Sequence, residues 1–287
     1  MFADLHLHTN FSDGTYTPEQ LAGHGKRCGF QAVALTDHDT MEGCERMAAA
    51  CLTNGVEFVP ATELTAEHDG HELHMLGFFL DAQNPKLVTD LGKFQHVRQQ
   101  RIHEMVARLN ELNIPLPVEA VFALANCRSP GRPHVARALI EAGLCRTLDE
   151  AFERFLRKGR PAWVPKFKVS ASEAIALIHQ AGGLAAMAHP GLNHNDDLIP
   201  ILVEAGMDGL ECFHTRHSTT ATQRYLEIAD RHHLLVTGGS DCHGMNKGKP
   251  LIGTIKIPYD CVLRMKEKVL ERAVAASPKL AEGSSSG

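Results

Sequence analysis

The sequence predicts an α/β barrel of parallel strands that is interrupted by a helical insertion. The first and last thirds of the chain alternate short apolar runs with helical patterns, which is the rhythm of repeated βα units. The middle third contains helical patterns alone. Histidine and carboxylate residues fall at or near the ends of the apolar runs, and parallel barrels gather their functional groups at the carboxyl ends of their strands. We therefore expect one barrel mouth that carries these side chains.

The first part of the barrel is expected over residues 1–84. A strand near 2–8 leads to Thr17, which is suited to cap a helix, and to Pro18, a favoured first helical residue. This helix is expected near 18–28. The other elements expected here are a strand at 32–35, a helix at 41–53, and strands at 56–64 and 72–80.

The stretch 85–168 breaks the rhythm and is too long for one crossover connection. We predict a helical insertion packed over the barrel mouth, with helices near 86–112, 117–125, 133–142 and 148–157. The barrel then resumes over 169–276. Its expected elements are helices at 171–181, 196–205, 219–232 and 258–275, and strands at 183–189, 209–213 and 233–241. Residues 277–287 are expected to form a flexible tail.

Composition narrows the class of protein. The 287-residue chain is 44% hydrophobic and has a formal net charge of -5, which argues against general nucleic-acid binding through a basic surface. No apolar run reaches the length of a membrane span. The eight cysteines form no Cys-x-x-Cys pair, so we expect free thiols in a reducing cytoplasm. No membrane and no obligatory protein partner are expected.

Histidines and acids recur in short motifs along the barrel segments. His6 and His8 alternate with leucines, so in a strand both imidazoles leave one face. Asp13 follows in a turn. The later candidates are His38, Glu63, His74, His189, Asp241 and His243. Convergence of these groups from separate strand ends predicts a multinuclear metal centre.

These motifs resemble those of a known family. HLHTNFSDG, LTDHDT, a glutamate at a strand end, AHPG and SDCHG follow, in order, the motifs of the polymerase-and-histidinol-phosphatase (PHP) phosphoesterases. The resemblance covers about 2–82 and 170–257, and it implies a distorted TIM-like (β/α)7 barrel. The insertion resembles that of the subgroup that hydrolyses 3',5'-bisphosphonucleosides, which includes 5' exonucleases of the RNase AM type.

The resemblance also implies three groups of metal ligands. His6, His8, Glu63 and Asp241 would hold one ion; Glu63, His74 and His189 a second, with Glu63 as the bridge; and Asp13, His38 and His243 a third. Imidazoles and carboxylates without thiolates suit Mn²⁺ best, with Fe or Zn as alternatives. Two or three such ions would share and activate a hydroxide for attack on a phosphate. Asp13, Glu63, Asp241 and His243 are the expected catalytic residues.

Three neighbours of these motifs carry weaker predictions. Asp37 is expected to fix the tautomer of His38. Asp39 would do the same or would cap the following helix. Cys242 lies between two ligands, and alternation predicts that it points away from them into the core.

Two segments are candidate phosphate grips. Arg132 and His134 open an insertion helix, and residues 154–168 hold six cations and no acid. The second segment fits a solvated basic face equally well. We expect Arg132, His134 and Lys168 to contact substrate phosphates, and His194 and His217, which follow barrel strands, to line the pocket.

The favoured hypothesis is a metal-dependent phosphomonoesterase that releases the 3' phosphate from a small 3',5'-bisphosphonucleoside, such as 3'-phosphoadenosine 5'-phosphate. The same pocket would admit the 5' end of a short RNA. Histidinol-phosphate phosphatase is an alternative that the basic insertion disfavours, because a monophosphate needs no second anion grip. A non-catalytic PHP module that assists a polymerase is an alternative of another class.

Overall fold

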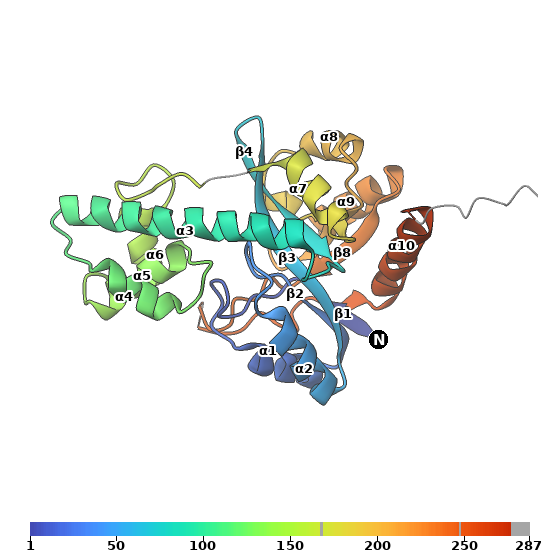
Figure 1. The fold of residues 1–287 in the computed structure, drawn as a ribbon, viewed down its shortest axis with the longest axis horizontal. Coiled ribbons are helices and arrows are strands. Elements are labelled where there is room, and N and C mark those ends of the chain that lie inside the picture. The colour runs from blue at the N-terminus through green and yellow to red at the C-terminus, as the bar shows by residue number, and fades with distance from the viewer. Residues whose placement is uncertain (167–168, 247, 277–287) are drawn as a thin grey trace, which may run out of the picture.

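The strands of the molecule form one sheet that curls into a barrel (Figure 1). The structure is a computed structural model that describes residues 1–166, 169–246 and 248–276. Within these residues the strand order is β8-β7-β6-β4-β3-β2-β1-β9, and β5 pairs with β3. The strands are β1 (Phe2–Asp4), β2 (Phe30–Leu35), β3 (Glu57–His68), β4 (His71–Phe78), β5 (Val169–Ser170), β6 (Leu184–Met187), β7 (Gly209–His214), β8 (Leu235–Gly239) and β9 (Ile257–Pro258).

The two ends of this order meet beside β1. The amide of Leu5 donates to the carbonyl of Gly238 at 3.1 Å, and Leu7 forms a parallel bridge with Cys242. The sheet is therefore nearly closed, and the predicted α/β barrel is confirmed. Leu5 and Leu7 are fully buried, as the predicted alternation requires.

Two strands depart from the prediction of parallel pairing: β4, and the short β9, which pairs with β1 in the antiparallel sense. β4 runs antiparallel to both β3 and β6. The cause is a tight hairpin at Asp69 and Gly70, which adopt φ of 47° and 77°. Positive φ at both central residues is the geometry that Asp-Gly pairs favour in two-residue hairpins. The expectation that every barrel strand is parallel is therefore wrong for β4 and β9.

The barrel helices lie close to where they are expected. They are α1 (Pro18–Arg27), α2 (Cys44–Asn54), α7 (Ala171–Gln180), α8 (Leu198–Glu204), α9 (Thr219–Arg231) and α10 (Asp260–Ala276). Thr17 caps α1 in a capping box with Gln20, and Pro18 is its first residue, as predicted. The eight cysteines are free thiols, and Cys242 is buried in a cluster with Leu7 and Leu21.

Residues 85–156 form the predicted helices, to one side of the barrel (Figure 1). They are α3 (Pro85–Glu111), α4 (Val118–Ala125), α5 (Arg132–Glu141) and α6 (Leu148–Ala151), followed by one π-helical turn at Phe152–Leu156. These helices share a hydrophobic cluster of their own that includes Ile102, Leu139 and Leu156. No helix among the described residues has the length and apolarity that crossing a membrane requires. The predicted tail at 277–287 lies outside the described residues.

Asp208, which immediately precedes β7, forms a clasp between parts of the barrel that are distant in the sequence. Its carboxylate accepts hydrogen bonds from Arg272 at 2.9 and 2.5 Å, from the ring of His179 at 2.9 Å and from the amide of Ala185 at 2.9 Å. Burial raises the pKa of Asp208, but these hydrogen bonds and the charge of Arg272 outweigh it and lower the pKa. The clasp therefore stabilises the fold above the pKa of an unfolded aspartate, and its contribution is lost as the pH falls.

Asp208→Asn is expected to lower the free energy of unfolding by about 1.5–3 kcal/mol at neutral pH, because charged hydrogen bonds are lost. Urea unfolding measures this, with the exposed Asp230→Asn as a control that should change little. The deficit should shrink on acidification; an equal deficit at every pH would show that the charge of Asp208 is not the cause.

Candidate metal centre

The barrel mouth gathers all nine of the histidines and acids that the motifs indicate. His6 and His8 follow β1, and His38 follows β2. Glu63 and His74 lie within the β3–β4 hairpin. His189 follows β6, Asp241 and His243 follow β8, and Asp13 lies in the turn after His8. His189 and Asp241 adopt φ of 31° and 52°, a strained backbone that is typical of functional sites.

Glu63 is the centre of the arrangement. Its Oε2 lies 3.4 Å from Nε2 of His6 and 3.3 Å from Nε2 of His8. The Oδ1 of Asp241 lies at the same distances, 3.4 and 3.3 Å, from those two nitrogens. Four ligands about 2.0–2.1 Å from a tetrahedral ion would be about 3.4 Å apart. The spacing is long for hydrogen bonds and fits a shared divalent cation.

The second oxygen of Glu63 faces a different group. Its Oε1 lies 2.7 Å from Nδ1 of His74 and 3.0 Å from Nε2 of His189. Nδ1 of His38 lies 3.0 Å from Oε2. One carboxylate thus touches ligand atoms on both sides, which is the position of a bridge between two cations.

Asp13 joins a third group. Its Oδ1 lies 3.2 Å from Nε2 of His243 and 3.9 Å from Nε2 of His38, and His8 lies within the same cluster. Nδ1 of His243 donates to the backbone carbonyl of Asp241 at 2.9 Å. This hydrogen bond places the proton of a neutral His243 on Nδ1 and leaves Nε2 open toward Asp13.

The centre contains buried polar atoms that have no hydrogen-bond partner among the described residues. They include Nε2 of His6, both ring nitrogens of His8, Oδ1 of Asp13, Nδ1 of His38 and Nδ1 of His189. Several buried polar atoms without partners at one place would lower the free energy of unfolding. Divalent cations would satisfy them, so the residues fit the metals that the sequence predicts.

Burial and charge act against each other on these groups. Burial alone lowers the pKa of His243, but the facing carboxylates of Asp13 and Asp241 outweigh it and raise the pKa to about 10. Burial likewise opposes a charged His6, yet Glu211, Glu63 and Asp241 raise its pKa well above the usual value. These imidazoles hold protons that a metal must displace.

Metal binding is therefore expected to release protons, and its affinity to rise with pH between about pH 6 and about pH 8, because raised pKa values mean that protons still compete there. Titration calorimetry with Mn²⁺ in buffers of different ionisation enthalpy measures both quantities. An affinity that does not change over this range would contradict the assignment of His6 and His243 as ligands.

Two acids next to His38 do not act as expected. Asp37 accepts hydrogen bonds from the amide of Thr9 at 2.7 Å and from Ser12 Oγ at 2.6 Å, so it braces the turn that leads to Asp13 rather than the ring of His38. Asp39 caps no helix. The predictions that Asp37 or Asp39 fixes the tautomer of His38, and that Asp39 caps the following helix, are therefore wrong. Both carboxylates bind partners that are distant in the sequence instead of their neighbours.

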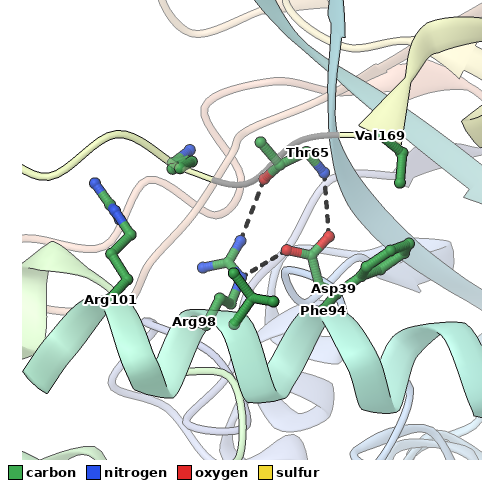
Figure 2. Close-up of a pocket in the computed structure, with 8 residues that line it drawn as sticks. Asp39, Thr65, Phe94, Arg98, Arg101 and Val169 are labelled. Atoms are coloured by element: carbon green, nitrogen blue, oxygen red, sulfur yellow. Dashed lines mark hydrogen bonds and ion pairs between the residues drawn. The ribbon is translucent and has the colours of Figure 1, made fainter.

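Asp39 instead ties the insertion to the barrel (Figure 2). Its Oδ2 accepts from Nε of Arg98 on α3 at 2.6 Å, and its Oδ1 accepts from the amide of Thr65 at 3.1 Å. Arg98 also donates to Thr65 Oγ1 at 3.3 Å. Sequence reasoning missed Arg98, because nothing in the local pattern of α3 distinguishes it from an exposed helical arginine.

The predicted substrate residues lie in different places. Arg132 begins α5, with its guanidinium over the ring of Phe152 at 5.8 Å. His134 is buried, and its Nδ1 accepts from the amide of Gly131 at 3.0 Å. Burial, and then the nearby Arg137, lower the pKa of His134 to about 4, so it is neutral and holds the start of α5.

The other three residues predicted to bind substrate are His217, His194 and Lys168, and none of them is placed at the metal centre by the described contacts. Both ring nitrogens of His217 bind backbone groups, the carbonyl of Cys212 at 2.9 Å and the amide of Gly191 at 3.2 Å, so this ring joins β7 to the turn that follows β6. His194 is exposed in a turn with φ of 52°. Lys168 lies outside the described residues.

The basic run at 154–168 divides into two kinds of residue. Arg154 pairs with Glu150 at 2.6 Å, and Arg157 and Arg160 both pair with Glu153, which is the behaviour of a solvated face. Lys166 instead turns inward, where its Nζ lies 3.3 Å from Nε2 of His74. It is the second residue of the site that sequence reasoning did not single out.

Two pockets flank the centre. A narrow one is lined by Asp39, Thr65, Phe94, Val97, Arg98, Arg101, Lys166 and Val169 (Figure 2). A larger one, of about 660 Å³, is lined by Asp13, Pro133, Thr147, Leu148, Asp149, Phe152, Asp241, His243, Gly244, Asn246, Lys249 and Leu251. The larger pocket shares Asp13, Asp241 and His243 with the centre, so a ligand there reaches the metal-binding groups.

Comparison with known proteins places this chain in a family. The PHP domain family matches residues 4–142. A 3',5'-nucleoside bisphosphate phosphatase from Chromobacterium violaceum is 31% identical, over 90% of this chain and 93% of the relative. The 5'-3' exoribonuclease Rnm from Escherichia coli is 30% identical over 84% of each chain. A phosphoribosyl 1,2-cyclic phosphate 1,2-diphosphodiesterase from Eggerthella lenta is 31% identical, over 88% of this chain and 98% of the relative.

A solved structure agrees with these relatives. A protein from Bifidobacterium adolescentis that is assigned to the metal-dependent phosphoesterases superposes with a TM-score of 0.86 at 34% identity, covering 92% of this chain and 94% of that one. Sequence, fold and the convergence of the motifs at one barrel mouth agree: this chain belongs to the PHP family and is a metal-dependent phosphoesterase.

Proposed function

We propose that this enzyme is a phosphomonoesterase that releases the 3' phosphate from 3',5'-bisphosphonucleosides such as 3'-phosphoadenosine 5'-phosphate. The observation that carries the proposal is a group of cations beside the metal centre, which is suited to a second phosphate. The similarity to a bisphosphate phosphatase over nearly the whole chain supports the same substrate class.

The cations come from the insertion, and three of them line the narrow pocket. Arg98 and Arg101 lie one turn apart on α3 and point toward the narrow pocket (Figure 2). Lys166 lines the same pocket. Burial, followed by the charges of Arg132 and Arg98, lowers the pKa of Arg101 to about 9. Burial is also the main cause of the lowered pKa values of Arg132 and Lys166.

Depressed pKa values in neighbouring cations mean that their charges are poorly compensated. Arg98 differs from these three, because its 2.6 Å contact with Asp39 outweighs burial and raises its pKa. Glu72 supplies part of the compensation for Lys166, through a contact of 3.0 Å. A phosphate bound at the entrance of this narrow pocket would supply the remaining compensation through charged hydrogen bonds. This pocket adjoins His74, so an anion held there lies next to a phosphate on the centre.

The larger pocket suits the nucleoside. Phe152, Leu148 and Leu251 offer apolar contact, while Thr147 and Asn246 offer hydrogen bonds to a base or a ribose. A ribose carries its base and its two phosphates in three directions. The proposed pose sets the 3' phosphate on the centre, the base in the larger pocket and the 5' phosphate on the cations.

Bound divalent ions would activate water and neutralise charge on the phosphoryl group. The protein's part is to hold them and to orient the ester. The proposed metal is Mn²⁺, and the nine candidate ligands would hold the ions. The proposed catalytic residues are four of these ligands: Asp13, Glu63, Asp241 and His243. Arg98 and Lys166 fix the far end of the substrate, so that one phosphate alone reaches the reacting position.

Lys166→Met and Arg132→Ala are each expected to lower kcat/KM for 3'-phosphoadenosine 5'-phosphate by about tenfold to a hundredfold, the value of a lost charged hydrogen bond. The loss should be much smaller for adenosine 3'-monophosphate, which lacks the second anion. Phosphate release from both nucleotides measures the difference. Arg157→Ala, in the same basic run but paired with Glu153, is the matched control.

Equal losses on the two nucleotides would mean that these cations do not hold the distal phosphate. The same assay separates the other candidates. Preferred hydrolysis of histidinol phosphate would indicate a histidinol phosphatase. Release of mononucleotides from a 5'-phosphorylated RNA would add the exonuclease activity, which the similarity to Rnm favours.

The eight free thiols suit a reducing compartment, and we propose that the enzyme acts in the cytoplasm.

A further inference from the structure

A buried acid outside the nine predicted ligands contacts two of them at once. Glu211 lies in β7 and is fully buried. Its Oε1 lies 2.9 Å from Nδ1 of His6, and its Oε2 accepts from the backbone amide of His189 at 2.6 Å. His6 and His189 belong to opposite sides of Glu63, since they face its Oε2 and its Oε1 respectively.

Each contact has a chemical consequence. A carboxylate accepts hydrogen bonds, so His6 donates from Nδ1 and a neutral His6 keeps Nε2 free of a proton. That Nε2 is the atom that lies 3.4 Å from both Glu63 and Asp241. At His189 the amide hydrogen bond holds a backbone with φ of 31°, a conformation that a non-glycine residue adopts only when its surroundings impose it.

We propose that Glu211 is a positioning residue that prepares both sides of the metal centre, by fixing the tautomer of His6 and the backbone of His189. The inference rests on the metal-binding part of the proposed function and not on the identity of the substrate. Outer carboxylates of this kind orient histidine ligands in metal sites, and their loss weakens metal binding by about 10- to 100-fold.

Glu211→Gln tests the tautomer directly. An amide offers one acceptor and one donor group, whereas both partners of Glu211 are donors. The backbone amide of His189 cannot change, so the amide oxygen turns toward it and the NH₂ group faces His6. His6 then accepts at Nδ1 and carries its proton on Nε2, where it excludes a metal.

Glu211→Asp separates position from charge. It keeps the negative charge beside the centre but is one methylene too short to reach both partners. If charge alone mattered, this variant would bind Mn²⁺ as the wild type does. Positioning predicts that both variants bind Mn²⁺ at least about tenfold more weakly at the His6 site. Asp208→Asn, which removes a buried carboxylate just before β7, is the matched control and should bind Mn²⁺ normally.

The measurements are Mn²⁺ stoichiometry and affinity by calorimetry, together with the melting temperature of each chelated, metal-free protein. Weaker binding by both variants, with metal-free melting near that of the wild type, supports the inference. Wild-type affinity in either variant overturns it, and if Glu211→Gln does not fold, Glu211→Asp decides. A wild-type protein that binds no divalent ion would instead overturn the metal centre itself, so the two failures are distinguishable.

Discussion

Glu63→Gln is expected to lower metal occupancy on both sides of the centre and to reduce kcat by at least about a hundredfold, more than loss of an outer partner of a ligand would. The reason is that Oε1 and Oε2 of Glu63 contact different groups of histidines, at 2.7 to 3.4 Å. A glutamine has one oxygen able to bind a cation, and it lacks the charge that balances two adjacent ions. Metal analysis of the purified variant and phosphate release measure the two effects.

Glu57→Gln is the matched control for this substitution. Glu57 begins the same strand and contacts Tyr259 and Lys266, away from the mouth. It should leave the metal content and kcat unchanged. A Glu63→Gln protein with full metal content and wild-type kcat would remove Glu63 from the bridge.

Chelation is expected to abolish phosphate release, and Mn²⁺ is expected to restore it better than Mg²⁺. The centre offers six imidazoles beside three carboxylates, and imidazole nitrogen binds Mn²⁺ more readily than Mg²⁺, which prefers oxygen and water. Activity of stripped protein, reloaded with each metal in turn, measures the preference.

Two results would count against this account. Full turnover with Mg²⁺ alone would mean that the nitrogen-rich groups do not hold the catalytic ions. Phosphate release by protein that is verified to be metal-free would remove metal chemistry from the reaction altogether.

The nine residues at the centre could be predicted from the sequence because each lies in a local motif that ends or interrupts a strand. Alternation alone placed Leu5 and Leu7 in the core and His6 and His8 on the opposite face. Their convergence then follows from barrel geometry, since strand ends meet at one mouth. The helices of the insertion were equally predictable, because proline and helical periodicity mark them locally.

The roles of Asp37, Asp39, Arg98 and Lys166 could not be predicted in the same way. Their partners lie in other elements, and only the packing of the insertion against the barrel brings Arg98 to Asp39. The reversal of β4 was different, since the Asp69-Gly70 pair is a hairpin signal that the sequence contains. The expectation of parallel strands outweighed it.

That reversal determines where the insertion starts. Because β4 is antiparallel, its last residue Phe78 pairs with Leu184 at the start of β6, at the end of the barrel opposite the metal centre. The chain must travel back, and α3, with 27 residues, spans about 40 Å. Leu87 and Leu91 anchor its first turns in the barrel core, whereas Ile102 and Met105 belong to the core of the insertion.

The helix α3 therefore joins the hydrophobic core of the barrel to that of the insertion. Its base near Leu87 and Leu91, which would be the pivot of any rotation, lies far from the metal centre. A rotation of about 5° at its base would displace the far end of a 40 Å rod by about 3.5 Å. Arg98 and Arg101 lie midway along this rod, so they would move by about half as much. Substitutions at the pivot, remote from every ligand, would thus alter the spacing between the cations and the metals, and so the length of substrate that spans them.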